Sequence, residues 1–371
     1  MIDYIGFCKN KSEIQQAKNL AFENFRNVKA LQNIFWNDVD NLKPDSIYII
    51  KQKDIVLGLI RVVERIVLRG KDKLKICGLS HICIKKNYRK KGLLNILMTG
   101  CIETLKERGF DFIYLIARKK VDKMYSKYGF IGISSYEKKI LNLNNENTNV
   151  NKLKITKIGQ NDINFIQRCY LKNYKKNLFF FYRSTSRWKY LIKLLNLYKV
   201  NIQLIKSDNI RIGYIIFKEN HVYEYGLIEG KYFKLTKLLF NKLFKKNVII
   251  DIDDDHRLNE NINDLEFSSY KKRVDFGGHM VKILNYDKLI SSAKKDLFLI
   301  FKNNNIKSFL YTNPSYSIKL KKNNLEIRFS KNYKSEVKSN LFLLNVKVLG
   351  ESHVGKINFG KFFSFLKADE I

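Results

Sequence analysis

Residues 80–94 read Ser80-His-Ile-Cys-Ile-Lys-Lys-Asn-Tyr-Arg-Lys-Lys-Gly-Leu-Leu94, and no other part of the chain is as informative. The pattern is a short apolar strand, a basic turn with one glycine, and the start of an amphipathic helix. In such an arrangement the N–H groups of the turn and the helix N-terminus point at one spot, where the helix dipole favours negative charge. Gly92 lets the backbone come close to a ligand, and Arg89, Lys90 and Lys91 add cations. The stretch therefore predicts a pyrophosphate site.

The segments around this stretch alternate between helix and strand patterns. The expected elements are helices over residues 13–33, strands over 46–52, 55–63 and 74–84, the helix after Gly92, a strand over 110–117, a short helix over 121–128 and a strand over 130–141. Gly109 stands where a helix C-terminal cap is wanted. This order predicts a compact α/β unit that ends near residue 142.

The rest of the chain predicts two further units. An asparagine-rich run at 142–149 is the best candidate linker. The elements expected after it are a helix over 162–175, strands over 200–206, 213–218 and 221–227, a helix over 234–246, a hairpin over 317–330, and terminal segments at 341–344 and 359–366. The basic amphipathic helix over 234–246 could lie on a membrane. Packing on a sheet with its lysines in solvent is the favoured interpretation.

Length and composition narrow the class of protein. A chain of 371 residues with 45% hydrophobic residues is expected to form about two or three globular domains. It has no apolar run of about 18 residues, and its first residues do not resemble a secretory signal. The five cysteines include no Cys-x-x-Cys pair, which argues against a disulfide framework and a zinc site. These features predict a cytoplasmic protein without a transmembrane segment.

The formal charge of +35 would attract any polyanion. However, the lysines are spread over all segments, and the chain is rich in Lys, Asn, Ile, Phe and Tyr throughout. A general compositional bias therefore explains the charge better than a specific nucleic-acid site, because charge alone supplies only non-specific binding.

The strand, the Arg-x-x-Gly-x-x turn, the amphipathic helix and the later Tyr125-Ser-Lys-Tyr-Gly-Phe130 together resemble the GNAT N-acetyltransferase superfamily. The GNAT turn usually ends in Gly or Ala, where this chain has Leu94. Arg-x-x-Gly-Leu-Leu is similar to the turn of the enhanced-intracellular-survival (Eis) family. That resemblance implies an α+β (α/β) fold with an active GNAT domain over 1–142, a second, degenerate GNAT-like domain over 150–278, and a sterol-carrier-like α+β domain over 280–371.

The resemblance also implies a site. Acetyl-coenzyme A would be the acetyl donor, with no metal. It would be bound along the strand and the turn by Ile82, Cys83, Ile84, Arg89, Lys90, Lys91, Gly92, Leu93, Leu94 and Asn95. Tyr125 matches the tyrosine that protonates the leaving thiolate, and a phenol of pKa ~10 can do so. Tyr128 is the rival for this role. The terminal carboxylate of Ile371 would act as the base.

The implied activity is acetyl transfer to a primary amine of a small molecule, of aminoglycoside or polyamine type, or to lysine. The family further implies a homo-oligomer, and no specific nucleic-acid partner is expected. A surface with 70 basic and 35 acidic residues should repel a polycation at long range, although salt screens this effect. Asp38 and Asp40 beside Trp36 are candidate carboxylates for such an acceptor. The alternatives are a catalytically silent scaffold that carries an apolar ligand, and a non-specific nucleic-acid-binding protein.

An acidic run and one cysteine each allow a functional and a structural interpretation. The run Asp251-Ile-Asp-Asp-Asp-His256 could hold a hard cation, but a solvated turn that offsets local lysines is favoured. Cys83 lies beside the expected thioester, but a small buried side chain explains it better than a nucleophile does.

Overall fold

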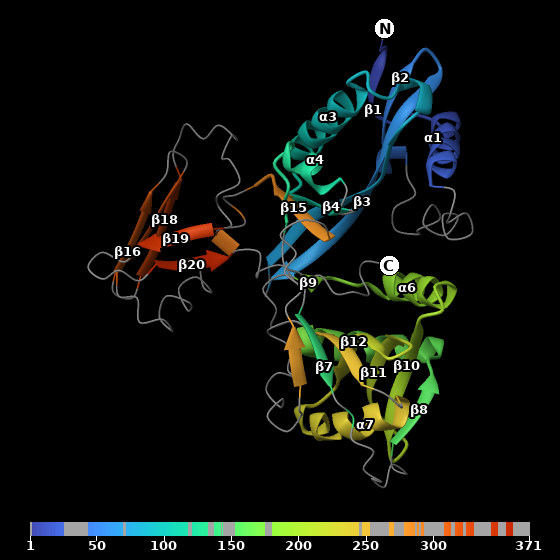
Figure 1. Ribbon diagram of the computed structural model, residues 1–371, viewed down its shortest axis with the longest axis vertical. Coiled ribbons are helices and arrows are strands. Elements are labelled where there is room, and N and C mark those ends of the chain that lie inside the picture. Colours follow the sequence, from blue (N-terminus) through green and yellow to red (C-terminus); the bar gives the residue numbers. More distant parts are fainter. Residues whose placement is uncertain are drawn as a thin grey trace.

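The computed structural model describes residues 2–25, 44–69, 72–117, 121–132, 137–141, 143, 153–174, 180–244, 247–252, 267–270, 278–285, 288, 291–292, 308–312, 316–321, 324–329, 343–347 and 354–358. Two large mixed sheets form the body of the protein, and two small antiparallel sheets follow them in the chain (Figure 1). The predicted combination of helices with mixed sheets is confirmed.

The first sheet has the order β1-β2-β3-β4-β5-β15-β6, and β9 pairs with β3 outside this path. Its only parallel pair among the described strands is β4 with β5. The strands are β1 (Tyr4–Phe7), β2 (Ile47–Gln52), β3 (Ile55–Arg69), β4 (Asp72–Ile84), β5 (Phe112–Ala117), β6 (Ile131–Gly132), β9 (Phe180–Phe181) and β15 (Gly278–Ile283). The strands predicted over 46–52, 55–63, 74–84 and 110–117 are thus present, and β3 is longer than expected.

Helices cover both faces of the first sheet. On one face α3 (Leu93–Glu107) buries Leu97 and Met98 in the same cluster as the sheet residues Ile50 and Ile60, and the short helix α4 (Asp122–Ser126) lies on this side. On the other face α1 (Lys11–Asn24) packs through Ala17 and Leu20. Alternate side chains of β2 pack in the cluster under α3 and in the cluster under α1, as expected of a strand that is covered on both faces.

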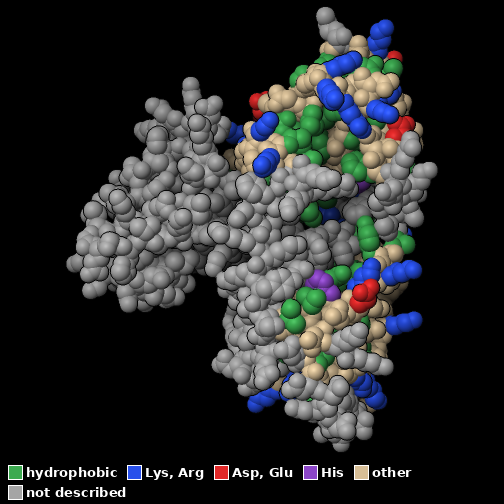
Figure 2. All heavy atoms as spheres, viewed as in Figure 1, with side chains coloured by type: hydrophobic (Ala, Val, Ile, Leu, Met, Phe, Trp, Pro, Cys, Tyr) green, Lys and Arg blue, Asp and Glu red, His purple; other side chains and the backbone are tan. Residues whose placement is uncertain are grey.

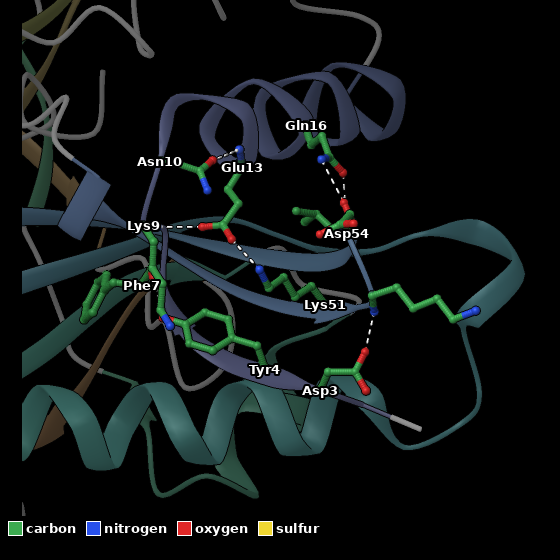
Figure 3. Close-up of polar contacts among 11 residues, drawn as sticks. Asp3, Tyr4, Phe7, Lys9, Asn10, Glu13, Gln16, Lys51 and Asp54 are labelled. Carbon is green, nitrogen blue, oxygen red and sulfur yellow. Dashed lines mark hydrogen bonds and ion pairs between the residues drawn. The ribbon is translucent and has the colours of Figure 1, made fainter.

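Polar contacts fix α1 to the edge of the sheet, as Figure 3 shows. Asn10 caps the helix by accepting a hydrogen bond from the Glu13 N–H at 2.9 Å. The Glu13 carboxylate in turn accepts from the Lys9 N–H and from Lys51 Nζ of β2, both at 2.6 Å. Burial opposes ionisation of Glu13, but the Lys51 and Lys9 donors outweigh it and lower its pKa. These contacts set where the other end of α1 lies.

The second sheet has the order β14-β7-β13-β12-β11-β10-β8. Helices α5 (Ile163–Tyr174) and α6 (Thr185–Leu197) pack on one face, and α7 (Thr236–Leu243) packs on the other. The strands are β7 (Glu137–Leu141), β8 (Leu153–Lys157), β10 (Asn201–Ser207), β11 (Ile210–Lys218), β12 (His221–Leu227), β13 (Val248–Ile252) and β14 (Phe267–Tyr270). Helix α6 was not predicted.

The basic helix α7 buries Leu239 and Phe240 against this sheet, so its packing on a sheet is confirmed. No helix in the described part of the chain is long and apolar enough to cross a membrane. Lys and Arg side chains are visible over both the upper and the lower part of the face in Figure 2.

The two large sheets exchange strands. The orange strand β15 lies among the blue strands of the first sheet, and β7 lies among the strands of the second (Figure 1). The prediction of one strand over 130–141 was therefore wrong. Ile131–Gly132 pairs with β15, whereas Glu137–Leu141 pairs with β13 and β14. The alternation of side chains marks strand character but does not say which sheet accepts the strand.

The last strands form two separate small sheets, β16-β17-β18 and β19-β20. Their bounds are β16 (Ser308–Thr312), β17 (Tyr316–Lys321), β18 (Asn324–Phe329), β19 (Leu343–Lys347) and β20 (Val354–Asn358). The antiparallel pairing of β17 with β18 confirms the hairpin predicted there. The predicted segment 359–366 and residues 253–256 of the acidic run lie outside the described residues.

The exchange predicts that residues 1–142 do not fold stably alone. Without β15, β5 loses the partner that pairs with all of Phe112–Ala117, and Leu115 and Ala117 lose cover in the core. We expect a 1–142 fragment to be aggregated or to melt without a cooperative transition, whereas a 1–285 fragment, which contains β15, melts cooperatively. Thermal unfolding followed by circular dichroism measures this. A 1–142 fragment that melts as cooperatively as the longer one would contradict the structural role of β15.

Candidate active site

A cleft of about 660 Å³ opens where β4 and β5 separate. The two strands pair in parallel at Ile76–Phe112, Cys77–Ile113 and Gly78–Tyr114, and the register ends there. The next residues of both strands line the cleft, as do residues from α1, the β4–α3 turn, α3 and α4. The carboxyl ends of parallel strands are a recurrent place for ligand sites, because two strands diverge and leave backbone groups exposed.

The cleft edge of β4 is irregular. Opposite β3, Leu59 faces Cys83 and Arg61 faces Ser80, so His81 and Ile82 share the place of a single partner residue. His81 has a φ of +49°, in the left-handed region. This is a β-bulge, a feature that bends a strand and changes the aim of its side chains. No described strand pairs with the β5-facing edge of β4 beyond Gly78, which leaves it accessible to a ligand.

The turn between β4 and α3 brings two left-handed residues to the helix N-terminus. After a 3₁₀ turn (Lys86–Tyr88), Lys90 has a φ of +61° and Gly92, the N-cap of α3, has a φ of +76°. The Leu93 and Leu94 N–H groups have no acceptor within the helix, because they belong to its first turn. A Cβ built on Gly92 would meet no atom within 4 Å. The N-terminus of α3 therefore faces open space that an anion could fill.

Arg89 ties this turn to its surroundings. Its Nε donates to the Ile84 carbonyl at 3.1 Å, and its Nη2 donates to the side chain of Asn24 at the end of α1. The guanidinium thus holds the strand, the turn and α1 together beside the cleft. Its charge remains near the helix N-terminus, where it adds to the attraction for an anion.

Most of the sequence-predicted site residues meet at this cleft. Those that line it are Ile82, Cys83, Ile84, Arg89, Lys90, Gly92, Leu93, Leu94 and Tyr125. Lys91 and Asn95 do not line it; both are exposed, and Lys91 Nζ lies 5.3 Å from the centre of the Tyr88 ring. Ile371 and residues 36–40, which include the predicted Trp36, Asp38 and Asp40, lie outside the described residues.

Tyr125 reaches the cleft from α4. The side chain is half-buried against the core on the α3 face, with its ring centre 6.1 Å from that of Phe130. Tyr128, the rival in the sequence, also packs on this core but does not line the cleft, and burial raises its pKa. Of these two tyrosines, Tyr125 is the one that lines the cleft.

Cys83 is buried, and desolvation raises the pKa of its thiol to about 12. A thiol with that pKa is protonated at neutral pH and is a poor nucleophile. Burial also raises the pKa of the Cys8 and Cys169 thiols to about 12, so the same conclusion holds for them. The packing interpretation of Cys83 is therefore the better one.

Several cleft residues were not predicted from the sequence. Phe25 and Asn24 come from the end of α1, His81 comes from the bulge, and Ser80 directly precedes the bulge. His81 is half-buried; desolvation first, and then the Arg61 guanidinium, lower its pKa to about 4. Its ring is therefore neutral at pH 7. Ser80 and His81 stand in the informative stretch, but nothing in a single sequence marks a bulge.

Comparison with known proteins identifies the class of this domain. Residues 9–132 match the family model described as an acetyltransferase (GNAT) domain. No curated protein matches the chain by sequence. The domain defined by this match makes the protein an acyltransferase, and GNAT enzymes take their acetyl group from acetyl-coenzyme A.

Solved structures extend the fold similarity over most of the chain. A GCN5-related N-acetyltransferase from Anabaena variabilis has a TM-score of 0.62 at 13% identity, covering 88% of this chain and 86% of that one. A GCN5-related N-acetyltransferase from Kribbella flavida has a TM-score of 0.59 at 10% identity, covering 90% and 85%. Eis1 from Mycobacterium abscessus has a TM-score of 0.56 at 11% identity, covering 90% and 86%. At these identities the likeness concerns the fold.

Two glycines that flank α3 give a matched test of the anion site. Gly92 and Gly109 have φ values of +76° and +74°, and a Cβ on either would meet no atom within 4 Å. Valine at either position should thus destabilise the fold similarly, by about 1–2 kcal/mol. Only Gly92 lines the cleft. We expect Gly92→Val to weaken coenzyme A binding at least about tenfold and Gly109→Val to leave it unchanged. Isothermal titration calorimetry measures both affinities. Equal affinities would contradict a phosphate site at Gly92.

Proposed function

We propose that this protein transfers the acetyl group of acetyl-coenzyme A to a primary amine of a small molecule, of aminoglycoside or polyamine type, or to lysine. The observation that carries the proposal is the cleft itself. It joins an open strand edge, a helix N-terminus with an open approach, and a tyrosine in one continuous space. These are the groups that a thioester donor and its leaving thiolate require.

Acetyl-coenzyme A binds through its pyrophosphate and through the amide groups of its pantetheine arm. The pyrophosphate lies at the N-terminus of α3, against the N–H groups of Leu93 and Leu94 and beside Arg89 and Lys90. The amide-containing pantetheine arm adds to the open edge of β4 at Ile82–Ile84, as an extended peptide adds to a sheet. A backbone N–H of this edge donates to the thioester carbonyl and stabilises the oxyanion that forms there.

The chemical step forms one bond and breaks one. The neutral amine attacks the thioester carbon, the C–N bond forms, and collapse of the tetrahedral intermediate breaks the C–S bond. The thiolate takes its proton from the Tyr125 hydroxyl, and the amine loses a proton to a base. The terminal carboxylate of Ile371 is the proposed base. The products are an N-acetyl amine and free coenzyme A.

The remaining parts of the proposal concern the whole chain. The catalytic domain covers residues 1–142, a second GNAT-like domain residues 150–278, and a sterol-carrier-like domain residues 280–371. Two strands are exchanged across these bounds, because β7 pairs in the second sheet and β15 completes the first. Likeness of the fold to Eis1 over most of the chain supports this division. The proposed assembly is a homo-oligomer in the cytoplasm.

The proposed function predicts that the full-length chain releases free thiol from acetyl-coenzyme A only when an amine is present. A colorimetric thiol assay with spermidine, kanamycin and a lysine-containing peptide measures this, and mass spectrometry of the amine should show the added acetyl group. Binding of acetyl-coenzyme A without turnover on any of these amines would point to the catalytically silent scaffold instead.

A second prediction isolates the proton donor. Tyr125→Phe should lower kcat by about 10²–10⁴-fold, because the thiolate then leaves without a positioned acid. The affinity for acetyl-coenzyme A should change little, since the ring remains. Tyr128→Phe removes a hydroxyl from the same segment but from a side chain that does not line the cleft, and it should keep its kcat. If Tyr128→Phe were the slower variant, the assignment of Tyr125 would be wrong.

A further inference from the structure

The cleft lies between β4 and β5 and is lined by residues that pack on both faces of the sheet. Gly92, Leu94 and Tyr125 line it on the face that α3 and α4 cover, and Leu94 and Tyr125 pack against the core there. Phe25 and Cys83 line it on the other face and belong to the cluster beneath α1. If the donor fills the α3 face, as the proposed function requires, the acceptor reaches the thioester from the α1 face.

His81 stands on that second wall. Its ring and the Phe25 ring meet edge to face, with centres 5.4 Å apart. Its Nδ1 lies 3.2 Å from the Ser80 hydroxyl oxygen. The backbone that presents the ring is the bulge, and the left-handed φ of +49° is a strained conformation for a histidine. Such strain persists where the surrounding structure enforces it, and it clusters at functional sites.

The charge state of the ring suits an amine. Desolvation and the Arg61 guanidinium keep the imidazole neutral at pH 7, with a pKa of about 4. A neutral ring nitrogen accepts a hydrogen bond from an amine N–H, whereas an imidazolium would repel an ammonium group and offer no acceptor. Arg61 is 1% exposed on β3, across the strand pair from Ser80, so its effect on the ring is fixed by the sheet.

We propose that His81 and Phe25 form the acceptor side of the site, in which the His81 ring accepts a hydrogen bond from the attacking amine and the Phe25 ring packs on its carbon chain. This inference rests on the proposed function and specifies its acceptor subsite. The favoured acceptor is a primary amine on a flexible aliphatic carbon chain. His81 orients the nucleophile, while Tyr125 on the opposite face serves the leaving group.

The test compares the wild type with variants of the whole chain. The substrate is the amine that gives the fastest thiol release in the assay above. His81→Ala should raise KM for the amine by about two- to tenfold, the effect of one lost hydrogen bond. The Kd of acetyl-coenzyme A should stay within about twofold. His81→Asn should recover much of the loss, because asparagine tolerates a left-handed backbone and supplies a side-chain acceptor. His221→Ala, in β12 of the second sheet, is the control and should change neither value.

The outcomes separate this inference from the function on which it rests. If the wild type releases thiol but His81→Ala has an unchanged KM for the amine, the acceptor subsite is overturned. The acetyltransferase proposal then remains intact. An equal loss of acetyl-coenzyme A affinity also overturns it, since that is the result of a structural defect. Absence of turnover by the wild type overturns both. If His81→Ala does not fold, Phe25→Leu carries the same comparison, with a selective rise in amine KM expected.

Discussion

The parallel pairing of β4 with β5 is short, and the functional part of the fold depends on where it ends. Three residue pairs join the strands, and beyond Gly78 and Tyr114 each strand continues without the other. One edge of β4 is thereby released, and the bulge at His81 and Ile82 changes the direction of its side chains just where the strands part. A longer ladder would fill the cleft with backbone hydrogen bonds and leave no edge for a ligand.

The partners of the two strands keep the cleft open. β4 is held on its other side by the long antiparallel pairing with β3, and β5 is held along its whole length by β15. Both strands are therefore fixed in their divergent directions. Because β15 comes from residues 278–283, the catalytic sheet depends on a segment that follows the entire second sheet in the chain. The two large units are thus coupled through backbone pairing as well as through side-chain packing.

The sequence predicted the local parts of this arrangement and missed its non-local parts. The turn before α3 could be predicted because a glycine at the start of an amphipathic helix is a local signal, and the structure places Gly92 at the N-cap of α3. The pairing of β15 with β5 could not, because strand patterns carry no information on partners far apart in the chain. His81 was overlooked for a similar reason. Its proposed role depends on a register shift between β3 and β4 and on the position of Phe25 at the end of α1.

Backbone conformation accounts for most of the candidate site. His81, Lys90 and Gly92 all have positive φ values, and together they shape the edge of the strand and the entrance to α3. N–H groups presented in this way bind phosphate and amide groups whatever the side chains are. The side chains are then free to vary with the acceptor, which is where Phe25 and His81 lie. Under the proposed function, donor recognition rests mainly on this backbone, and the wall beneath α1 is the part of the site proposed to select the acceptor.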